Sequence, residues 1–122
     1  MARRKTGSVT FKTVRDIGLS LPDVEESTSY GTPALKTRRK LFARLHQDGH
    51  HLVLKCELLE REMLLQAAPE VFSITDHYKD YPWILVDLST VSRDALPDMI
   101  ERAWRMVASK KQLAQHGSSS ED

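Results

Sequence analysis

Two apolar segments joined by a tight-turn signal constrain the fold of this chain more than any other feature. Residues 40–46 and 51–56 have the composition of strands, and Gln47-Asp48-Gly49 lies between them. Asp-Gly favours a hairpin because both residues accept positive φ at little cost. Arg38-Arg39 is expected to turn the chain into the first of these strands from an earlier, edge or bulged strand at 29–37. The pattern predicts an antiparallel meander.

Three segments have the apolar spacing of amphipathic helices: residues 10–21, 57–68 and 92–107. Proline follows the first at position 22 and the second at position 69, where it would end a helix. In the second segment the apolar residues recur every four positions, at Leu59, Met63 and Ala67.

Short strands are expected at 71–75 and 83–88, and the acidic stretch 23–26 is expected to be a loop. The expected order is helix, three strands, helix, two strands, helix. An antiparallel sheet needs one face covered, and the terminal helices are the natural cover. We therefore predict an α+β fold, a two-layer sandwich of helices on one antiparallel β-sheet.

Composition favours one cytoplasmic domain. The chain has 122 residues, a formal net charge of +1 and a single cysteine, Cys56, which excludes an internal disulfide. No apolar run is long enough to cross a membrane, and the basic start of the chain is not followed by the apolar stretch of a signal peptide. We expect a flexible basic N-terminus at 1–8, the domain at 9–114 and a flexible C-terminal tail at 115–122.

A basic segment is the main indication of nucleic acid. Between positions 36 and 46 there is no acidic residue. Cations on a rigid hairpin can contact phosphates and release counterions, which supplies affinity independent of base sequence. The alternative is a solvated hairpin that charge keeps from edge pairing, and composition alone favours that alternative. The segment's five basic residues are Lys36, Arg38, Arg39, Lys40 and Arg44.

The second candidate surface is the aromatic segment His77-Tyr78-Lys79-Asp80-Tyr81-Pro82-Trp83. Large aromatic side chains with polar groups are typical of surfaces that hold a partner, and tyrosines can stack on exposed bases. For Tyr78 and Tyr81 the sequence supports binding of a partner and simple packing equally. We expect Trp83 to lie in the core and face the last helix near Trp104, and Tyr30 to approach the tyrosine surface.

Metal and catalytic sites have little support in the sequence. Adjacent His50 and His51 would point to opposite faces of a strand, and no recognised metal-ligand or nucleophile motif occurs. His77 beside Tyr78 or Asp80 is the best acid–base set, but an exposed histidine next to a tyrosine is usually inert. Cys56 is expected to be a buried small hydrophobe. We expect no cofactor, no metal site and no catalytic residue.

Several stretches of the chain together form a recognisable pattern. They are Ser29-Tyr30-Gly31-Thr32-Pro33-Ala34, Lys40-Leu41-Phe42-Ala43-Arg44-Leu45, Leu52-Val53-Leu54-Lys55, His77-Tyr78 through Tyr81-Pro82-Trp83, Val86-Asp87-Leu88 and Ala103-Trp104 with Val107-Ala108. In this order, from about residue 11 to residue 113, the chain resembles the MmcQ/YjbR family. The resemblance implies a fold similar to that of bacterial frataxin, or CyaY. It also implies DNA binding through a proposed double-wing arrangement of hairpins, and it identifies no catalytic residue.

Two functions follow as expectations. The leading one is DNA binding, with the five basic residues on phosphates and DNA as the partner. The alternative is a non-enzymatic domain that binds a small molecule or a protein. Its surface would be formed by Tyr30, His77, Tyr78 and Tyr81. A monomer with no membrane contact is favoured.

Overall fold

The computed structural model describes residues 9–121, with side chains through His116. Its centre is a six-stranded antiparallel sheet with the strand order β1-β2-β3-β4-β6-β5. The strands are β1 (Val24–Ser29), β2 (Thr32–Thr37), β3 (Lys40–Leu45), β4 (His51–Lys55), β5 (Phe72–Ser73) and β6 (Trp83–Asp87). The helices are α2 (Phe11–Leu19), α3 (Leu58–Ala67), α4 (Leu96–Arg105) and α5 (Lys110–Glu121), with short 3-10 turns η1 (Asp76–Tyr78) and η2 (Arg93–Ala95).

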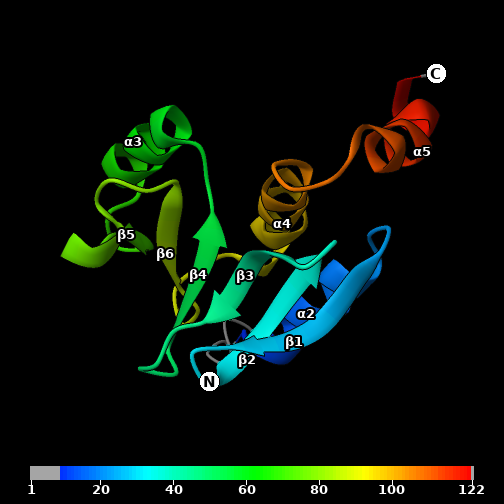
Figure 1. The fold of residues 1–122 in the computed structure, drawn as a ribbon. Helices are drawn as coiled ribbons and strands as arrows, with labels where there is room; N and C mark the ends of the chain where they lie inside the picture. Colours follow the sequence, from blue (N-terminus) through cyan, green and yellow to red (C-terminus); the bar gives the residue numbers. More distant parts are fainter. Residues whose placement is uncertain (1–8, 122) are drawn as a thin grey trace.

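Helices α2 and α4 cover one face of the sheet and form the main core with it (Figure 1). Val14 of α2, Ile100 and Trp104 of α4, and Leu35 and Phe42 of the sheet are fully buried there. The Trp104 ring also donates a 3.1 Å hydrogen bond from Nε1 to the Pro22 carbonyl oxygen, which satisfies its one polar atom. The predicted α+β class and two-layer arrangement are confirmed.

Tight turns fix the register of the first four strands. Arg38 and Arg39 have φ of 54° and 68°, so both central residues of the β2–β3 turn are left-handed, as a two-residue type I′ hairpin requires. In the β3–β4 turn Gly49 has φ of 75°, and Asp48 Oδ1 accepts hydrogen bonds from the backbone N–H groups of His50 and His51. Both predicted turns are confirmed.

The prediction that the acidic segment 23–26 is a loop is wrong, because Val24–Ser29 forms the edge strand β1. A further hairpin turn at Tyr30-Gly31 joins it to β2, so β2 is an interior strand. The predicted bulge does occur, between Leu35 and Lys36 in the pairing with β3. An edge strand pairs with only one neighbour and needs little apolar burial. The polar sequence of β1 therefore gave no strand signal.

The α3 and C-terminal segments also differ from expectation. The four-residue repeat in α3 faces solvent, with Leu59 77% and Met63 64% exposed. The final helix begins after the η2 turn, ends at Arg105, and is followed by the separate helix α5. The backbone of α5 is helical through Glu121, across most of the segment expected to form a C-terminal tail, whereas residues 1–8 lie outside the described residues.

Candidate functional site

The face of the sheet opposite to α2 and α4, called the open face below, carries its own small apolar cluster. Val53, Leu85 and Tyr78 are buried in it, and Trp83 packs against them. Trp83 and Val53 alternate along their strands with Ile84 and Leu54, which face the helices. The expectation that Trp83 lies against the last helix near Trp104 is therefore wrong, because the two tryptophans occupy opposite faces.

A pocket of about 250 Å³ opens beside this cluster. All four residues predicted for the alternative function lie in its wall: Tyr30 from the β1–β2 turn, and His77, Tyr78 and Tyr81 from the segment that crosses the open face. Tyr30 and Tyr81 remain 73% and 59% exposed, whereas Tyr78 is buried. We call this the aromatic pocket; its full lining is Tyr30, Leu41, Arg44, Val53, His77, Tyr78, Tyr81 and Trp83.

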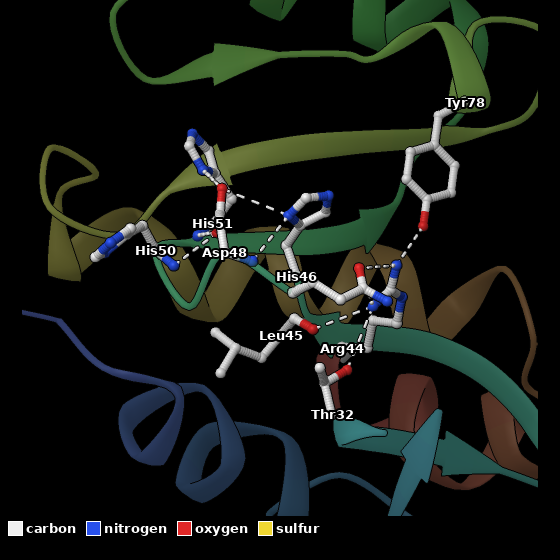
Figure 2. Close-up of polar contacts among 9 residues, drawn as sticks. Thr32, Arg44, Leu45, His46, Asp48, His50, His51 and Tyr78 are labelled. Atoms are coloured by element: carbon white, nitrogen blue, oxygen red, sulfur yellow. Dashed lines mark hydrogen bonds and ion pairs between the residues drawn. The ribbon is translucent and has the colours of Figure 1, made fainter. Parts of the chain in front are cut away.

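Arg44 lies in the pocket wall and not on the basic turn, which corrects its predicted role as an exposed phosphate contact. It is only 4% exposed. Its Nη2 donates a 2.7 Å hydrogen bond to the Tyr78 hydroxyl, and its Nη1 donates to Thr32 Oγ1 and to the Leu45 carbonyl oxygen. Figure 2 shows the guanidinium pointing to Tyr78, away from the turn at Asp48. The Tyr30 ring lies 5.1 Å from Arg44 Cζ, in cation–π geometry.

A second hollow of about 340 Å³ adjoins the aromatic pocket. It shares Tyr30, Arg44, His77 and Tyr78 with the pocket, so these four residues line both spaces. His77 packs edge-on against Tyr78, with 4.7 Å between the ring centroids. The other lining residues of the second hollow are His46, Gln47 and Thr75.

Arg61 holds the aromatic segment in place, and the sequence offered no sign of this role. This α3 residue is buried and donates from Nη1 to the carbonyl oxygens of Tyr78, Tyr81 and Trp83 at 2.8–3.0 Å. Its Nη2 donates to the Lys79 carbonyl oxygen at 2.7 Å. The residue is one of two arginines whose Nε atoms are buried without a partner among the described residues, the other being Arg44.

Two of the other predicted cations, Arg38 and Lys36, lie near the β2–β3 turn on opposite faces of the sheet. Arg38 donates a 3.3 Å hydrogen bond to the Val107 carbonyl oxygen, on the helix side. Lys36 pairs in register with Leu41, a residue of the aromatic pocket, and with Glu25 of β1. Among the side chains of residues 9–116, the four predicted cations other than Arg44 form no ion pair with an acidic group: Lys36, Arg38, Arg39 and Lys40.

Lys55 also lies on the open face, and it was not among the predicted site residues. Its Nζ lies 4.7 Å from the centroid of the Trp83 ring. Burial, and then the nearby positive charge of Lys40, lower the pKa of Lys55. Lys55 therefore places an ammonium group beside the tryptophan that lines the aromatic pocket.

The β3–β4 turn gathers histidines around one carboxylate. Asp48 Oδ2 lies 2.8 Å from His51 Nδ1 and 3.4 Å from His46 Nδ1 (Figure 2). Burial raises the pKa of Asp48, but hydrogen bonds from His50 and His51 outweigh this and hold it well below its usual range. In the described part of the chain, no group of three or more His, Cys, Asp or Glu residues is arranged to hold a metal ion.

Cys56 lies at the edge of a different cavity, of about 270 Å³, between α3 and α4. It is buried, as predicted. Burial, and then the neighbouring Glu60 carboxylate, raise the pKa of its thiol to about 11, so it is a poor nucleophile at neutral pH.

None of the helices described between residues 9 and 121 has the length and apolar character needed to cross a membrane.

Comparison with known proteins agrees with this architecture. A family model described as YjbR matches residues 19–106. The chain belongs to the YjbR family. A solved YjbR-type relative, the Deinococcus radiodurans protein DR2400 with its DUF419 domain, superposes with a TM-score of 0.73 at 23% identity, over 92% of this chain and 91% of that one. That likeness supports the fold alone. No curated protein matched the sequence.

Proposed function

We propose that this YjbR protein is a non-enzymatic binding domain and that the aromatic pocket is its binding site. The observation that carries the proposal is the convergence of Tyr30, His77, Tyr78 and Tyr81 on one pocket, although they come from segments more than forty positions apart in the chain. Convergent aromatic and polar groups around an apolar floor are the usual composition of a ligand site.

The chemistry of the lining suits a planar ligand. Leu41 and Val53 supply an apolar floor, while Tyr81 and Trp83 offer aromatic faces. An aromatic ring excluded from water between such faces gains both apolar burial and favourable ring geometry. Tyr30 and Tyr81 are largely exposed without a ligand, so a bound ring would remove apolar surface from water.

A fragment titration followed by amide chemical shifts tests the proposal. Small aromatic compounds, neutral and charged, should shift amides at 28–32, at 44 and at 76–83. Tyr30→Ala with Tyr81→Ala should weaken that binding about tenfold or more. Leu59→Ala, an equally exposed apolar residue on α3, is the matched control and should change nothing. Shifts that gather in the cavity between α3 and α4 would contradict the proposal.

Single-stranded nucleic acid is a second candidate, favoured by Lys55, whose Nζ lies over the Trp83 ring, and by the positive charge of Lys40, which acts on Lys55. A partly buried aromatic ring next to an ammonium group can stack a base while nearby cations hold phosphates. The proposal differs from the predicted wings, because Arg44 is buried and Arg38 is turned to the helix side. Lys36, Arg39 and Lys40 are the predicted residues that this candidate keeps.

A salt titration separates the two candidates. Binding of a fluorescent oligothymidine should weaken steeply with salt, and Lys40→Ala with Lys55→Ala should reduce the slope of log affinity against log salt by about 1.4. Lys12→Ala with Lys111→Ala makes the same charge change on α2 and α5 and should leave the slope near that of the wild type. Absence of oligonucleotide binding at low salt would remove this candidate and leave the small-ligand pocket standing.

A further inference from the structure

We propose that the ligand of the aromatic pocket carries an oxyanion, a carboxylate or a phosphate, which binds at Arg44 and Tyr78. This inference rests on the proposed function, since it names the chemical class of ligand for the same pocket. The charge, the hydrogen-bond lengths and the free donors around Arg44 support it.

Arg44 carries a buried charge without a counter-charge. The residue is 4% exposed, yet no carboxylate of the described residues lies within ion-pair distance of it. Buried arginines are normally paired with an acid, because an uncompensated charge away from water is costly. The Nε of Arg44 also lacks a hydrogen-bond partner among these residues. An anion in the adjoining space would supply the missing charge.

Gln47 occupies the position that such an anion would take. Its Oε1 accepts hydrogen bonds from both Nη1 and Nη2 of Arg44, each at 3.4 Å. These contacts are long for charge-assisted bonds, and Gln47 itself is exposed. The oxygen of a neutral side chain at the fork of a guanidinium is a weak substitute for a carboxylate or phosphate, which can accept two bonds in the same geometry.

Tyr78 offers a second donor. Its hydroxyl oxygen accepts the 2.7 Å bond from Arg44, so the hydroxyl proton must point elsewhere. Through residues 9–116 no side chain or backbone group accepts that proton. Since Tyr78 lines both the aromatic pocket and the second hollow, the free donor is available to a ligand oxygen.

Three probes that share a phenyl ring separate the contribution of the anion from that of the ring. Benzoate and phenyl phosphate carry the oxyanion, and benzamide is the neutral isostere of benzoate. We expect benzoate or phenyl phosphate to bind at least about tenfold more tightly than benzamide, a difference of about 1.4 kcal/mol. The anion that binds more tightly shows whether the pocket prefers a carboxylate or a phosphate. Binding is located by the same amide shifts as above.

Gln47→Glu provides the decisive variant because it places a carboxylate at the Arg44 fork within the chain itself. It should weaken benzoate binding by about tenfold or more while leaving benzamide within about twofold. Gln66→Glu makes the same change on the exposed face of α3 and should alter neither. Tyr78→Phe removes the second donor and should weaken anion binding alone.

The outcomes separate this inference from the proposed function. If benzamide and benzoate bind the pocket equally and Gln47→Glu changes nothing, the anion is refuted while the aromatic pocket remains a binding site. If neither probe shifts the pocket amides, both proposals fail. An anion preference that Gln47→Glu removes and Gln66→Glu retains supports both.

Discussion

Arg61 Nη1 donates a 2.8 Å hydrogen bond to the carbonyl oxygen of Tyr81, 20 positions further along the chain. Together with the bonds to Tyr78, Lys79 and Trp83, this contact fastens the aromatic segment to α3. The pocket on the open face therefore depends on the guanidinium of an α3 residue. Part of its wall comes from the β1–β2 turn and part from the segment that Arg61 holds.

Replacing Arg61 by lysine should loosen the aromatic segment. One ammonium group cannot reach four carbonyl oxygens, so we expect a loss of about 2–4 kcal/mol in the free energy of unfolding. Urea denaturation measures the loss, and acrylamide quenching of tryptophan fluorescence should increase as Trp83 becomes more accessible. Val14→Ala, a core change on the helix side, should lower stability without that increase. Equal quenching in the two variants would contradict the proposed role of Arg61.

The β3–β4 turn should make stability depend on pH in the acid range. The pKa of Asp48 is lower in the folded protein than the ordinary value of 3.8, so the unfolded chain binds the extra proton as pH falls. The carboxylate therefore stabilises the fold above about pH 4, and this contribution is lost progressively at lower pH.

Asp48→Asn removes that titration while keeping an oxygen for the backbone N–H groups. The drop in urea midpoint between about pH 4.5 and about pH 2.5 should be smaller in this variant than in the wild type. Glu62→Gln, on the exposed side of α3, is the control for a simple loss of negative charge. An unchanged drop in Asp48→Asn would show that the turn carboxylate does not carry the effect.

Cys56 should react slowly with thiol reagents in the native protein. With its pKa raised to about 11, roughly one thiol in a thousand is ionised at about pH 8, and burial limits access further. Modification by a disulfide reagent should be at least about 100-fold slower in buffer than in urea. Because Cys56 is the chain's single cysteine, the released chromophore reports this site alone. Equal rates in both solvents would be incompatible with the buried position.

The exposed face of α3 should accept charge. Leu59→Lys is expected to change the free energy of unfolding by no more than about 0.5 kcal/mol, since the side chain is already in water. Ile100→Ala, at a fully buried position of α4, should cost about 2–5 kcal/mol. Chemical denaturation of both variants makes the comparison. A Leu59→Lys loss as large as that of Ile100→Ala would mean that α3 packs by its four-residue apolar repeat after all.

Local chemistry made the hairpins predictable from the sequence. Asp48-Gly49 directs the chain through backbone preferences that do not depend on distant residues. The Arg38-Arg39 turn was predicted from its place before the strand at 40–46, and its two arginines hold a positive φ that arginine does not favour. Strand β1 was missed because an edge strand exposed to solvent needs no apolar alternation. The orientation of α3 was missed because its buried anchor is Arg61, a polar residue that binds carbonyl groups rather than apolar side chains.

The site was predictable only in part. Tyr30, His77, Tyr78 and Tyr81 were named in the sequence as one surface, and the fold brings them together. Trp83 was assigned to the wrong face because β6 is apolar on both sides, so alternation alone gives no direction. Arg44 was grouped with the exposed cations because its burial comes from Tyr30 and Tyr78, which are distant in the chain.

The position of a bound phenyl phosphate tests the central claim most directly. A titration followed by amide and aromatic chemical shifts, with intermolecular contacts measured at saturation, should place the phenyl ring among Tyr30, Tyr81 and Trp83. The phosphate should lie within hydrogen-bond distance of Arg44 and the Tyr78 hydroxyl. Contacts confined to the cavity between α3 and α4, or no contacts at all, would contradict the assignment of the aromatic pocket as the binding site.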